Sequence, residues 1–414
     1  MATIRSKNPL EYIIPFSFLG ALLVAAFWFQ GNHSASTEKV KTPPPSEDEE
    51  TEVTDVDQPF LSDLTVYNRE KAFKGLTLYS VVGKAEVLLF SMEGKVLHRW
   101  PVDAQRARLL PNGNLLVLHG SKWGTRVSPW KELKFTVREY TWDGDVAWEY
   151  PSSERIHHDV QRLSNGDTIF AVRRNLAPQY MQLITHPKRL RFDTIRTDSL
   201  VEINREGAVT WRWNAEEVLD VNSCGNAGCE RENAADWTHI NTVSPLPNNR
   251  WFDAGDTRFR PGNILTVLRN WWEMKIIDKK SKDVVWSFSG DYRGGLSGGH
   301  DAYMIEPGLP GAGNILVFDN GRKLHKGESI ILEIEPPTGK LVWKYEDGTN
   351  FFSNSAGSVQ RLPNGNTFIS DDLSGRAFEV TPEGEIVWEL RGNFRTARSQ
   401  KYPLNYTEKF STLQ

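Results

Sequence analysis

The sequence predicts an all-β protein: a six-bladed β-propeller that follows an N-terminal transmembrane helix and a disordered acidic linker. Three observations carry this prediction: short β-rich runs between turn residues, a unit that recurs along the chain, and a tryptophan that closes each unit. The chain has 414 residues, enough for two ordinary domains or one large repeat architecture. Its 15 Trp exceed the usual need of a core, and its 2 Cys exclude a multi-cysteine zinc ribbon or a ferredoxin-type cluster.

The chain begins with a basic stretch and an uncharged run. Residues 1–11 include Arg5 and Lys7, and residues 12–29 read YIIPFSFLGALLVAAFWF without a charge. Eighteen such residues are at the short end of what spans a membrane, and the preceding positive charges place the N-terminus in the cytoplasm. We therefore predict a transmembrane anchor at 12–29. A cleaved signal peptide is the alternative, with the stretch 34–36 as a weak cleavage site.

A disordered linker is predicted over residues 30–60. Residues 31–57 hold eight acidic residues against two lysines, three consecutive prolines and almost no apolar side chains. Such a composition cannot bury enough apolar surface to fold. The net charge of −4 therefore comes from this stretch, and the propeller domain predicted at 61–414 is nearly neutral. That balance gives no support to a nucleic-acid partner, which normally requires a basic surface.

The first half of the repeated unit is an Asn-Gly or related turn followed by a strand. Asn-Gly is among the strongest short hairpin signals because both turn residues adopt positive φ. Five copies of this half are RLLPNGNLLVL (108–118), QRLSNGDTIFAV (161–172), RFRPGNILTVL (258–268), GLPGAGNILVF (308–318) and QRLPNGNTFIS (360–370).

The second half is a turn, usually with Gly, and a strand that closes on tryptophan, as in SMEGKVLHRW and TPEGEIVWEL. The six closing residues are Trp100, Trp148, Trp211, Trp286, Trp343 and Trp388. Six units of four-strand size indicate a six-bladed propeller in which each of these Trp packs between blades. A pair of β-sandwiches is the alternative, but it does not explain the periodic Trp.

The spacing also predicts how the ring is built. We expect it to close by pairing an early strand near residues 76–89 with the last blade. The two longest Trp spacings indicate insertions near 175–200 and 214–256, and insertions in propellers usually lie on one face.

Histidines recur at one position of the unit. In a propeller the innermost strand of each blade lines the central channel, and here that strand comes just before the Asn-Gly segment. At this position three consecutive units read IHHDV (His157, His158), DWTHINTV (His239, Asn241) and GGHDAY (His300, Asp301). Only nine His exist in the chain, so three in register are not expected by chance. We predict that His158, His239 and His300 face the axis and lie close together.

A second position, seven residues after the strand-opening Gly, carries Arg173, Arg269, Asn320 and Asp372. Arg suits multi-oxygen anions, and His beside such an anion can act as a nucleophile or a general base. A three-histidine zinc site is the alternative, but Arg269 argues against it because a guanidinium repels a divalent cation unless an anion lies between them. The predicted chemistry is transfer of an oxyanionic group, phosphate or sulfate. No Walker loop or carboxylate cluster supports phosphoryl transfer on a nucleotide.

These motifs resemble the bacterial arylsulfotransferase family. The ordered series that carries the resemblance is HHDVQRLSNGDTIF, DWTHINTV, GNILTVLRNWWEMKIIDKKSKDVVWSFSG, GGHDAY and NILVFDNG, within residues 75–395. The resemblance implies an exported six-bladed propeller that moves a sulfuryl group from an aryl sulfate ester to a phenolic acceptor, without a nucleotide sulfate donor. It implies no cofactor and no metal.

The resemblance also implies roles for residues. His300 would be the nucleophile that is sulfated in a ping-pong mechanism. The residues expected to hold the sulfuryl oxygens are His158, His239, Asn241 and Arg269. Either His158 or His239 would be the acid for the departing phenol and the base for the incoming one. Further substrate-binding residues are expected to be Arg173, Asp301 and Asn320.

Two features depart from the well-studied periplasmic members of that family. Those members begin with a β-sandwich domain, whereas here an anchor and a linker precede the blades. They also hold a disulfide shortly before the nucleophile, and here Cys224 and Cys229 stand before His239 instead, in SCGNAGC. We predict a short-loop disulfide between them because exported proteins form disulfides, with two thiols as the alternative.

The expected location is a single-pass membrane protein with its N-terminus in the cytoplasm and its propeller on the periplasmic, extracytoplasmic side; a homo-oligomer is left open. Two other functions compete with sulfate transfer. One is a non-catalytic propeller that binds a ligand or partner, because EPPTGKLVWKY resembles outer-membrane assembly and quinoprotein-type propellers; six blades and histidines in phase count against a quinone site. The other is a metal hydrolase built on the histidine cluster.

Overall fold

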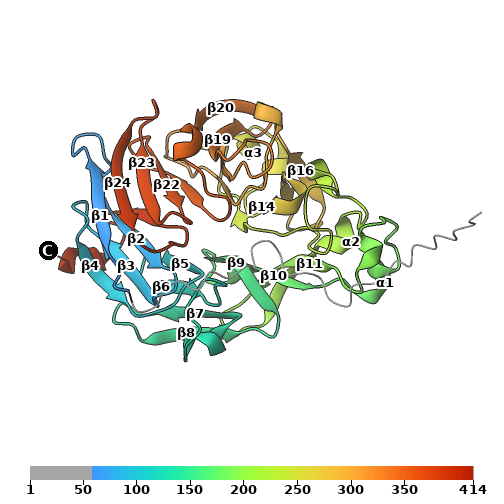
Figure 1. Cartoon of the computed structure of the whole chain (residues 1–414), viewed down its shortest axis with the longest axis horizontal. Helices are drawn as coiled ribbons and strands as arrows, with labels where there is room; N and C mark the ends of the chain where they lie inside the picture. The colour runs from blue at the N-terminus through green and yellow to red at the C-terminus, as the bar shows by residue number, and fades with distance from the viewer. Residues whose placement is uncertain (1–57, 414) are drawn as a thin grey trace, which may run out of the picture. The chain divides into compact units, whose positions relative to one another are not determined.

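The computed structural model describes residues 58–413, which fold as six antiparallel sheets arranged in a ring (Figure 1). Five sheets have four strands, and the sixth has a fifth strand at its outer edge. The prediction of an all-β six-bladed propeller is confirmed. Second strands such as β6 (Leu115–Leu118) are buried along their whole length because neighbouring blades cover both faces, which explains their continuous apolar sequences.

The strands run outward from the channel in each blade. The first three sheets are β25 (Gln400–Pro403), β2 (Gly75–Val81), β3 (Glu86–Phe90) and β4 (Val96–Trp100); β5 (Arg106–Leu109), β6, β7 (Thr136–Tyr140) and β8 (Val146–Pro151); and β9 (Arg155–Arg162), β10 (Thr168–Asn175), β11 (Arg196–Ile203) and β12 (Val209–Asn214). The other three are β13 (Ser244–Pro245), β14 (Ile264–Leu268), β15 (Glu273–Ile277) and β16 (Val284–Phe288); β17 (Asp301–Met304), β18 (Ile315–Asp319), β19 (Ile330–Glu335) and β20 (Lys340–Tyr345); and β21 (Ser358–Arg361), β22 (Thr367–Asp371), β23 (Arg376–Val380), β24 (Ile386–Gly392) and β1 (Ser62–Tyr67).

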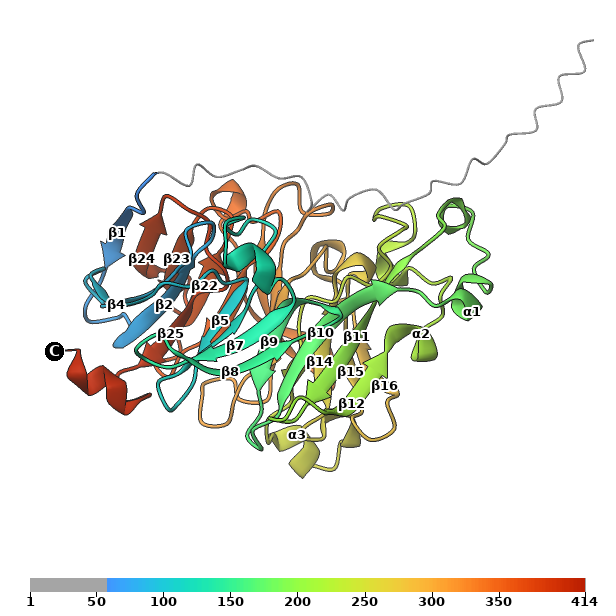
Figure 2. The ribbon, with the colours of Figure 1, turned by 90° about the horizontal axis from the view of Figure 1, so that it is seen from below.

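Both ends of the described chain close the ring. The C-terminal β25 is the inner strand of the first blade and pairs with β2, Leu76 opposite Tyr402. The N-terminal β1 pairs with β24 at the outer edge of the last blade, and Figure 2 shows the two strands side by side. The expected pairing of residues 76–89 with the last blade is therefore wrong in detail. The early strand that joins the last blade is β1, and residues 76–89 receive the C-terminal strand instead.

The closing tryptophans connect each blade to the next. Each donates its indole N–H to a backbone carbonyl of the following blade, at 2.6–3.1 Å. The pairs are Trp100–Thr141, Trp148–Arg205, Trp211–Lys279, Trp286–Pro336, Trp343–Pro382 and Trp388–Met92. The last pair joins the sixth blade to the first, so the bonds form a complete circle. The predicted packing of these Trp between blades is confirmed.

The insertions lie where the spacing predicts them. The connection between β10 and β11 carries α1 (Pro178–Met181) and η3 (Arg189–Arg191). The segment from β12 to β14 carries α2 (Ala215–Val218), η4 (Gly225–Ala227), α3 (Arg250–Asp253) and η5 (Thr257–Phe259). The other single-turn helices are η2 (Trp130–Leu133), η6 (Arg269–Trp271), η7 (Tyr292–Gly294), η8 (Gly348–Asn350) and η9 (Glu408–Thr412).

The anchor predicted at 12–29 and the linker up to residue 57 lie outside the described residues. Within residues 58–413 no helix is long and apolar enough to cross a membrane. Phe60, at the end of the predicted linker, already packs on the rings of Tyr79 and Phe90, with ring centroids 5.7 Å and 6.3 Å apart.

Candidate active site

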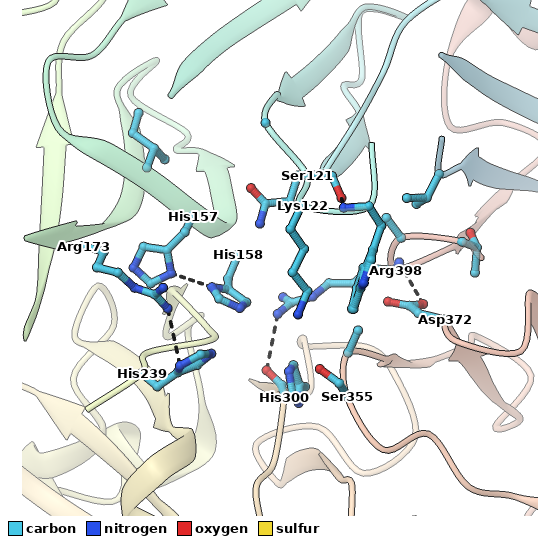
Figure 3. Close-up of a pocket in the computed structure, with 18 of the residues that line it drawn as sticks. Ser121, Lys122, His157, His158, Arg173, His239, His300, Ser355, Asp372 and Arg398 are labelled. Carbon is cyan, nitrogen blue, oxygen red and sulfur yellow. Dashed lines mark hydrogen bonds between the residues drawn. The ribbon is translucent and has the colours of Figure 1, made fainter. Parts of the chain in front are cut away.

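The predicted histidines gather at one end of the central channel, in a cavity of about 830 Å³ that includes its open mouth (Figure 3). His158 comes from β9, His239 precedes β13, and His300 directly precedes β17. The ring of His158 lies 5.0 Å from that of His239 and 6.3 Å from that of His300, centroid to centroid. The structure therefore brings together the three imidazoles that the repeat placed in phase.

Local backbone geometry aims two of these histidines at the channel. The pairing of β9 with β10 shifts register between Phe170 and Ala171, which leaves His158 in a bulge with φ of 61°. His239 likewise adopts φ of 50°. Positive φ is unfavourable for a residue with a Cβ and is found mainly where the surrounding structure imposes it, often at functional sites. The bulge lets the adjacent His157 and His158 both line the cavity.

His300 is held by Asn320, which follows β18. The Asn320 side-chain nitrogen donates to the carbonyls of Ser353 and Ala356, at 2.7 and 2.8 Å. Its oxygen must therefore face His300, whose Nδ1 lies 2.6 Å away. Because that oxygen can only accept, Nδ1 of His300 carries the proton and the lone pair of the neutral ring is on Nε2.

His239 lies between a carboxylate and two guanidinium groups. Its Nδ1 is 2.6 Å from Asp236 Oδ2, and its Nε2 is 3.1 Å from Arg269 Nη1. Arg173 Nη2 is 3.4 Å from the same Nδ1. Arg269 Nη1 also lies 3.2 Å from Nδ1, so the Asp236 carboxylate and two guanidinium groups surround this ring. Arg173 and Arg269, two of the residues at the second repeat position, thus form a cationic wall beside His239.

His158 is oriented through its neighbour. His157 Nε2 lies 3.0 Å from Asp198 Oδ1, and the Nδ1 atoms of His157 and His158 are hydrogen-bonded to each other. Burial, together with the nearby His157 and His239, holds the pKa of His158 well below its ordinary value. His158 is therefore neutral near pH 7.

Four of the predicted residues lie behind the cavity rather than on its surface. Arg269 contacts His239 and Asn320 contacts His300, but neither lines the cavity itself. Asn241 is buried, and its side-chain nitrogen donates to the Gly299 carbonyl at 3.0 Å. Asp301 faces the other part of the channel because it is the strand neighbour of His300 and points the opposite way. Among the predicted substrate-binding residues, Arg173 lines the cavity directly.

A buried charge cluster forms the floor of the cavity. Arg398 has one guanidinium nitrogen 3.3 Å from Asp301 Oδ1 and 3.8 Å from Asp159 Oδ2, while the other donates to the Asn241 carbonyl at 2.6 Å. Although burial opposes it, Arg108, Arg106 and Arg398 hold the pKa of Asp159 below its ordinary value. These side chains separate the histidine cavity from the rest of the channel.

Several of the residues around the cavity were not predicted. They are Lys122, Asp198, Asp236 and Arg398. Asp372 stands at the second repeat position, and burial raises its pKa from 3.8 to about 6. Its carboxylate accepts from Ser370 Oγ and from the Gly357 and Arg398 amides. Lys122 and Arg398 lie on connections outside the repeat, where periodicity gives no signal.

Cys224 and Cys229 form a disulfide, with their Cα atoms 5.1 Å apart. The bridge spans η4, whose Gly225 lies directly against Trp271 in η6, the short helix that begins with Arg269. The insertion thus supports the backbone of the cationic wall. Within residues 58–413 no group of three or more His, Cys, Asp or Glu is arranged to hold a metal ion.

Comparison with solved structures finds distant likenesses. A protein of unknown function from Bacteroides caccae matches with 13% identity over 77% of this chain and 94% of its own, at a TM-score of 0.48. Virginiamycin B lyase from Staphylococcus aureus, solved with quinupristin, matches with 9% identity over 84% of this chain and 89% of its own, at a TM-score of 0.40. Likenesses at these scores carry no information on activity. No curated protein matches the chain.

A family match is more informative. The sequence model of the family described as arylsulfotransferase (ASST) matches residues 136–393, which is more than half of the chain. The matched range runs from β7 in the second blade to the end of the sixth blade and includes every histidine of the cavity. The chain therefore belongs to the arylsulfotransferase family.

Proposed function

We propose that the protein moves a sulfuryl group from an aryl sulfate ester to a phenolic acceptor through a sulfated His300, independently of a nucleotide sulfate donor. The observation that carries this proposal is the fixed tautomer of His300. Asn320 accepts from Nδ1 and thereby leaves the Nε2 lone pair as the nucleophile, beside a wall of positive charge. Family membership supports transferase activity on aryl sulfates.

In the first half-reaction the Nε2 lone pair of His300 forms a bond to sulfur. The electron pair of the broken S–O bond remains on the phenolic oxygen, which leaves as a phenolate. The imidazole becomes positively charged, and its Nδ1–H bond to Asn320 strengthens because the donor is now charged. In the second half-reaction an acceptor phenolate attacks sulfur, and the N–S electron pair returns to Nε2.

The sulfuryl oxygens carry negative charge throughout, so fixed donors beside them lower the barrier. Arg173 lines the cavity, and Arg269 supports it through His239. Asp236 accepts the Nδ1 proton of His239 and keeps that ring oriented. We propose that Arg173, His239 and His158 hold the sulfuryl group, with Arg269 and Asn241 positioned behind them.

The proposed location is extracytoplasmic, with residues 12–29 as the membrane anchor and 30–60 as the linker. The disulfide supports this, since such bonds persist in oxidising compartments. The phenols and their sulfate esters are then small molecules that enter the open mouth of the cavity.

Mass spectrometry tests the intermediate. The full-length protein is incubated with 4-nitrophenyl sulfate without an acceptor, and the peptide that contains His300 is expected to gain the mass of one SO₃. Addition of phenol should remove that mass and form phenyl sulfate. His300→Ala should abolish both events. Sulfate transfer by the His300→Ala variant would disprove the assignment, and a wild-type protein inert to all aryl sulfates would favour a binding propeller.

A further inference from the structure

The loop between β6 and β7, residues 119–135, covers one side of the cavity. It precedes the range matched by the family, which starts at residue 136. Its first turn is fixed: Ser121 Oγ accepts from the Trp123 amide at 3.2 Å, and Asp103 accepts from the Thr125 amide at 3.4 Å. The loop therefore presents its side chains from a defined position.

Lys122 extends from this loop into the cavity. Figure 3 shows its side chain pointing toward the region of His158 and His300, and it lines the same cavity as both. The ammonium nitrogen is buried and lies 4.1 Å from the ring centroid of Trp123. A cation over an aromatic face is stabilised in a desolvated place. The indole thus supports a charged amine beside the reacting groups.

The proposed reaction needs a proton at the departing oxygen. His158 is neutral because its pKa is held low, and both ring nitrogens of His239 already have partners, Asp236 at Nδ1 and Arg269 at Nε2. A neutral imidazole is a poor proton donor to a phenolate. By contrast, Lys and a phenol have nearly equal ordinary pKa values, about 10.4 and about 10, so a proton passes between them at little cost.

We propose that Lys122 is a catalytic residue that donates a proton to the departing phenolic oxygen and accepts one from the incoming phenol. This rests on the proposed function of the site. When the S–O bond breaks, its electron pair takes the proton from the Lys122 ammonium, which leaves a phenol, a neutral amine and sulfated His300. In the return step the neutral Lys122 amine takes the proton of the acceptor phenol, and the phenolic oxygen attacks sulfur. The N–S electron pair then returns to Nε2 of His300.

The test compares donors with different leaving groups in the full-length protein. Poor leaving groups need the proton and good ones do not. With Lys122→Met we expect a loss of roughly 100-fold or more in the rate of enzyme sulfation by 4-methoxyphenyl sulfate, within the usual range of general acid catalysis, but less than roughly tenfold with 4-nitrophenyl sulfate. Lys131→Met, the same change at an exposed site of the same loop, should leave both rates unchanged.

Two further variants separate proton transfer from charge and from folding. Lys122→Arg retains the charge but does not release a proton, so it should still lose rate with 4-methoxyphenyl sulfate. Lys122→Ala should be rescued with that donor by added ethylammonium. Three outcomes would overturn the role of Lys122: equal losses with both donors, a fully active Lys122→Arg variant, or no rescue of Lys122→Ala. In each case the proposed sulfation of His300 would be unaffected. A wild-type protein that never sulfates His300 would instead remove the proposed function.

Discussion

Asn320 offers a direct test of how the nucleophile is prepared. Its side chain is fully buried and makes three hydrogen bonds: it accepts from His300 Nδ1 and donates to the carbonyls of Ser353 and Ala356. Asn320→Ala removes all three, and Asn320→Asp keeps the acceptor but places an oxygen against the two carbonyls. Both variants therefore lose stability, Asn320→Asp the more because its oxygen faces the two carbonyls, but they differ at His300.

The magnitude follows from the charge that His300 acquires. A hydrogen bond to a charged group contributes about 1.5–3 kcal/mol, which corresponds to roughly ten- to hundredfold in rate if the bond strengthens in the transition state. We expect Asn320→Ala to slow sulfation of His300 by that factor and Asn320→Asp to retain most of the rate. Each variant should lower the free energy of unfolding by about 1–3 kcal/mol for each carbonyl left unsatisfied.

The assay is the burst of 4-nitrophenol on mixing full-length protein with 4-nitrophenyl sulfate in the absence of acceptor, alongside thermal unfolding. Asn366→Ala is the matched control. Asn366 is also buried, donates to the Lys71 carbonyl at 2.8 Å and to Glu379, and does not line the cavity. It should lose stability without a change in burst rate. An Asn320→Asp variant as slow as Asn320→Ala would refute the reasoning, because acceptance of the Nδ1 proton would then not be what matters.

Three other predictions concern the site and the ring. Asp236→Asn should raise the KM for the sulfate donor and lower kcat by roughly tenfold or more, measured in steady state, because His239 loses the carboxylate that orients it. Burial raises the pKa of Asp372 to about 6, so its ionisation opposes folding by an amount on the order of 3 kcal/mol. The free energy of unfolding should therefore fall between about pH 4 and pH 6 as the pH rises, and denaturant unfolding of Asp372→Asn should show a smaller decrease, the remainder coming from Asp103, whose pKa burial also raises to about 6. Trp388→Phe leaves the Met92 carbonyl without its donor and should cost about 0.5–1.5 kcal/mol in the same assay, whereas an unchanged midpoint would mean that this bond contributes nothing to closure.

Much of the fold could be predicted because the same sequence pattern recurs in every blade. Trp100 and Trp388 occupy equivalent positions, and the structure gives each the same bond to the next blade. The clustering of His158, His239 and His300 followed from the same register. Periodicity reports what all blades share, so it located the inner strands without any knowledge of their packing.

What could not be predicted lies where the blades differ. Lys122 is on a connection of one blade, and Arg398 precedes the closing strand. Neither has an equivalent residue in the other blades, so the repeat does not indicate that its side chain points into the cavity. The orientation of Asp236 and Asp198 depends on side-chain hydrogen bonds between segments distant in sequence. The closure of the ring by the C-terminal strand was not predicted. The pairing of β25 with β2 joins residues more than three hundred positions apart, and a local sequence pattern does not specify such a pairing.

The closing strand has a consequence for when the protein can act. Arg398 stands just before β25 and provides the cation between Asp159 and Asp301 under the histidines. During synthesis this segment follows all the other strands of the described ring, and β25 pairs with β2 more than three hundred positions earlier, the kind of contact that forms late. A nascent or truncated chain therefore lacks both the final strand of the first blade and the counter-charge of the floor. The activity proposed for this pocket would begin only after β25 has been made and has paired with β2.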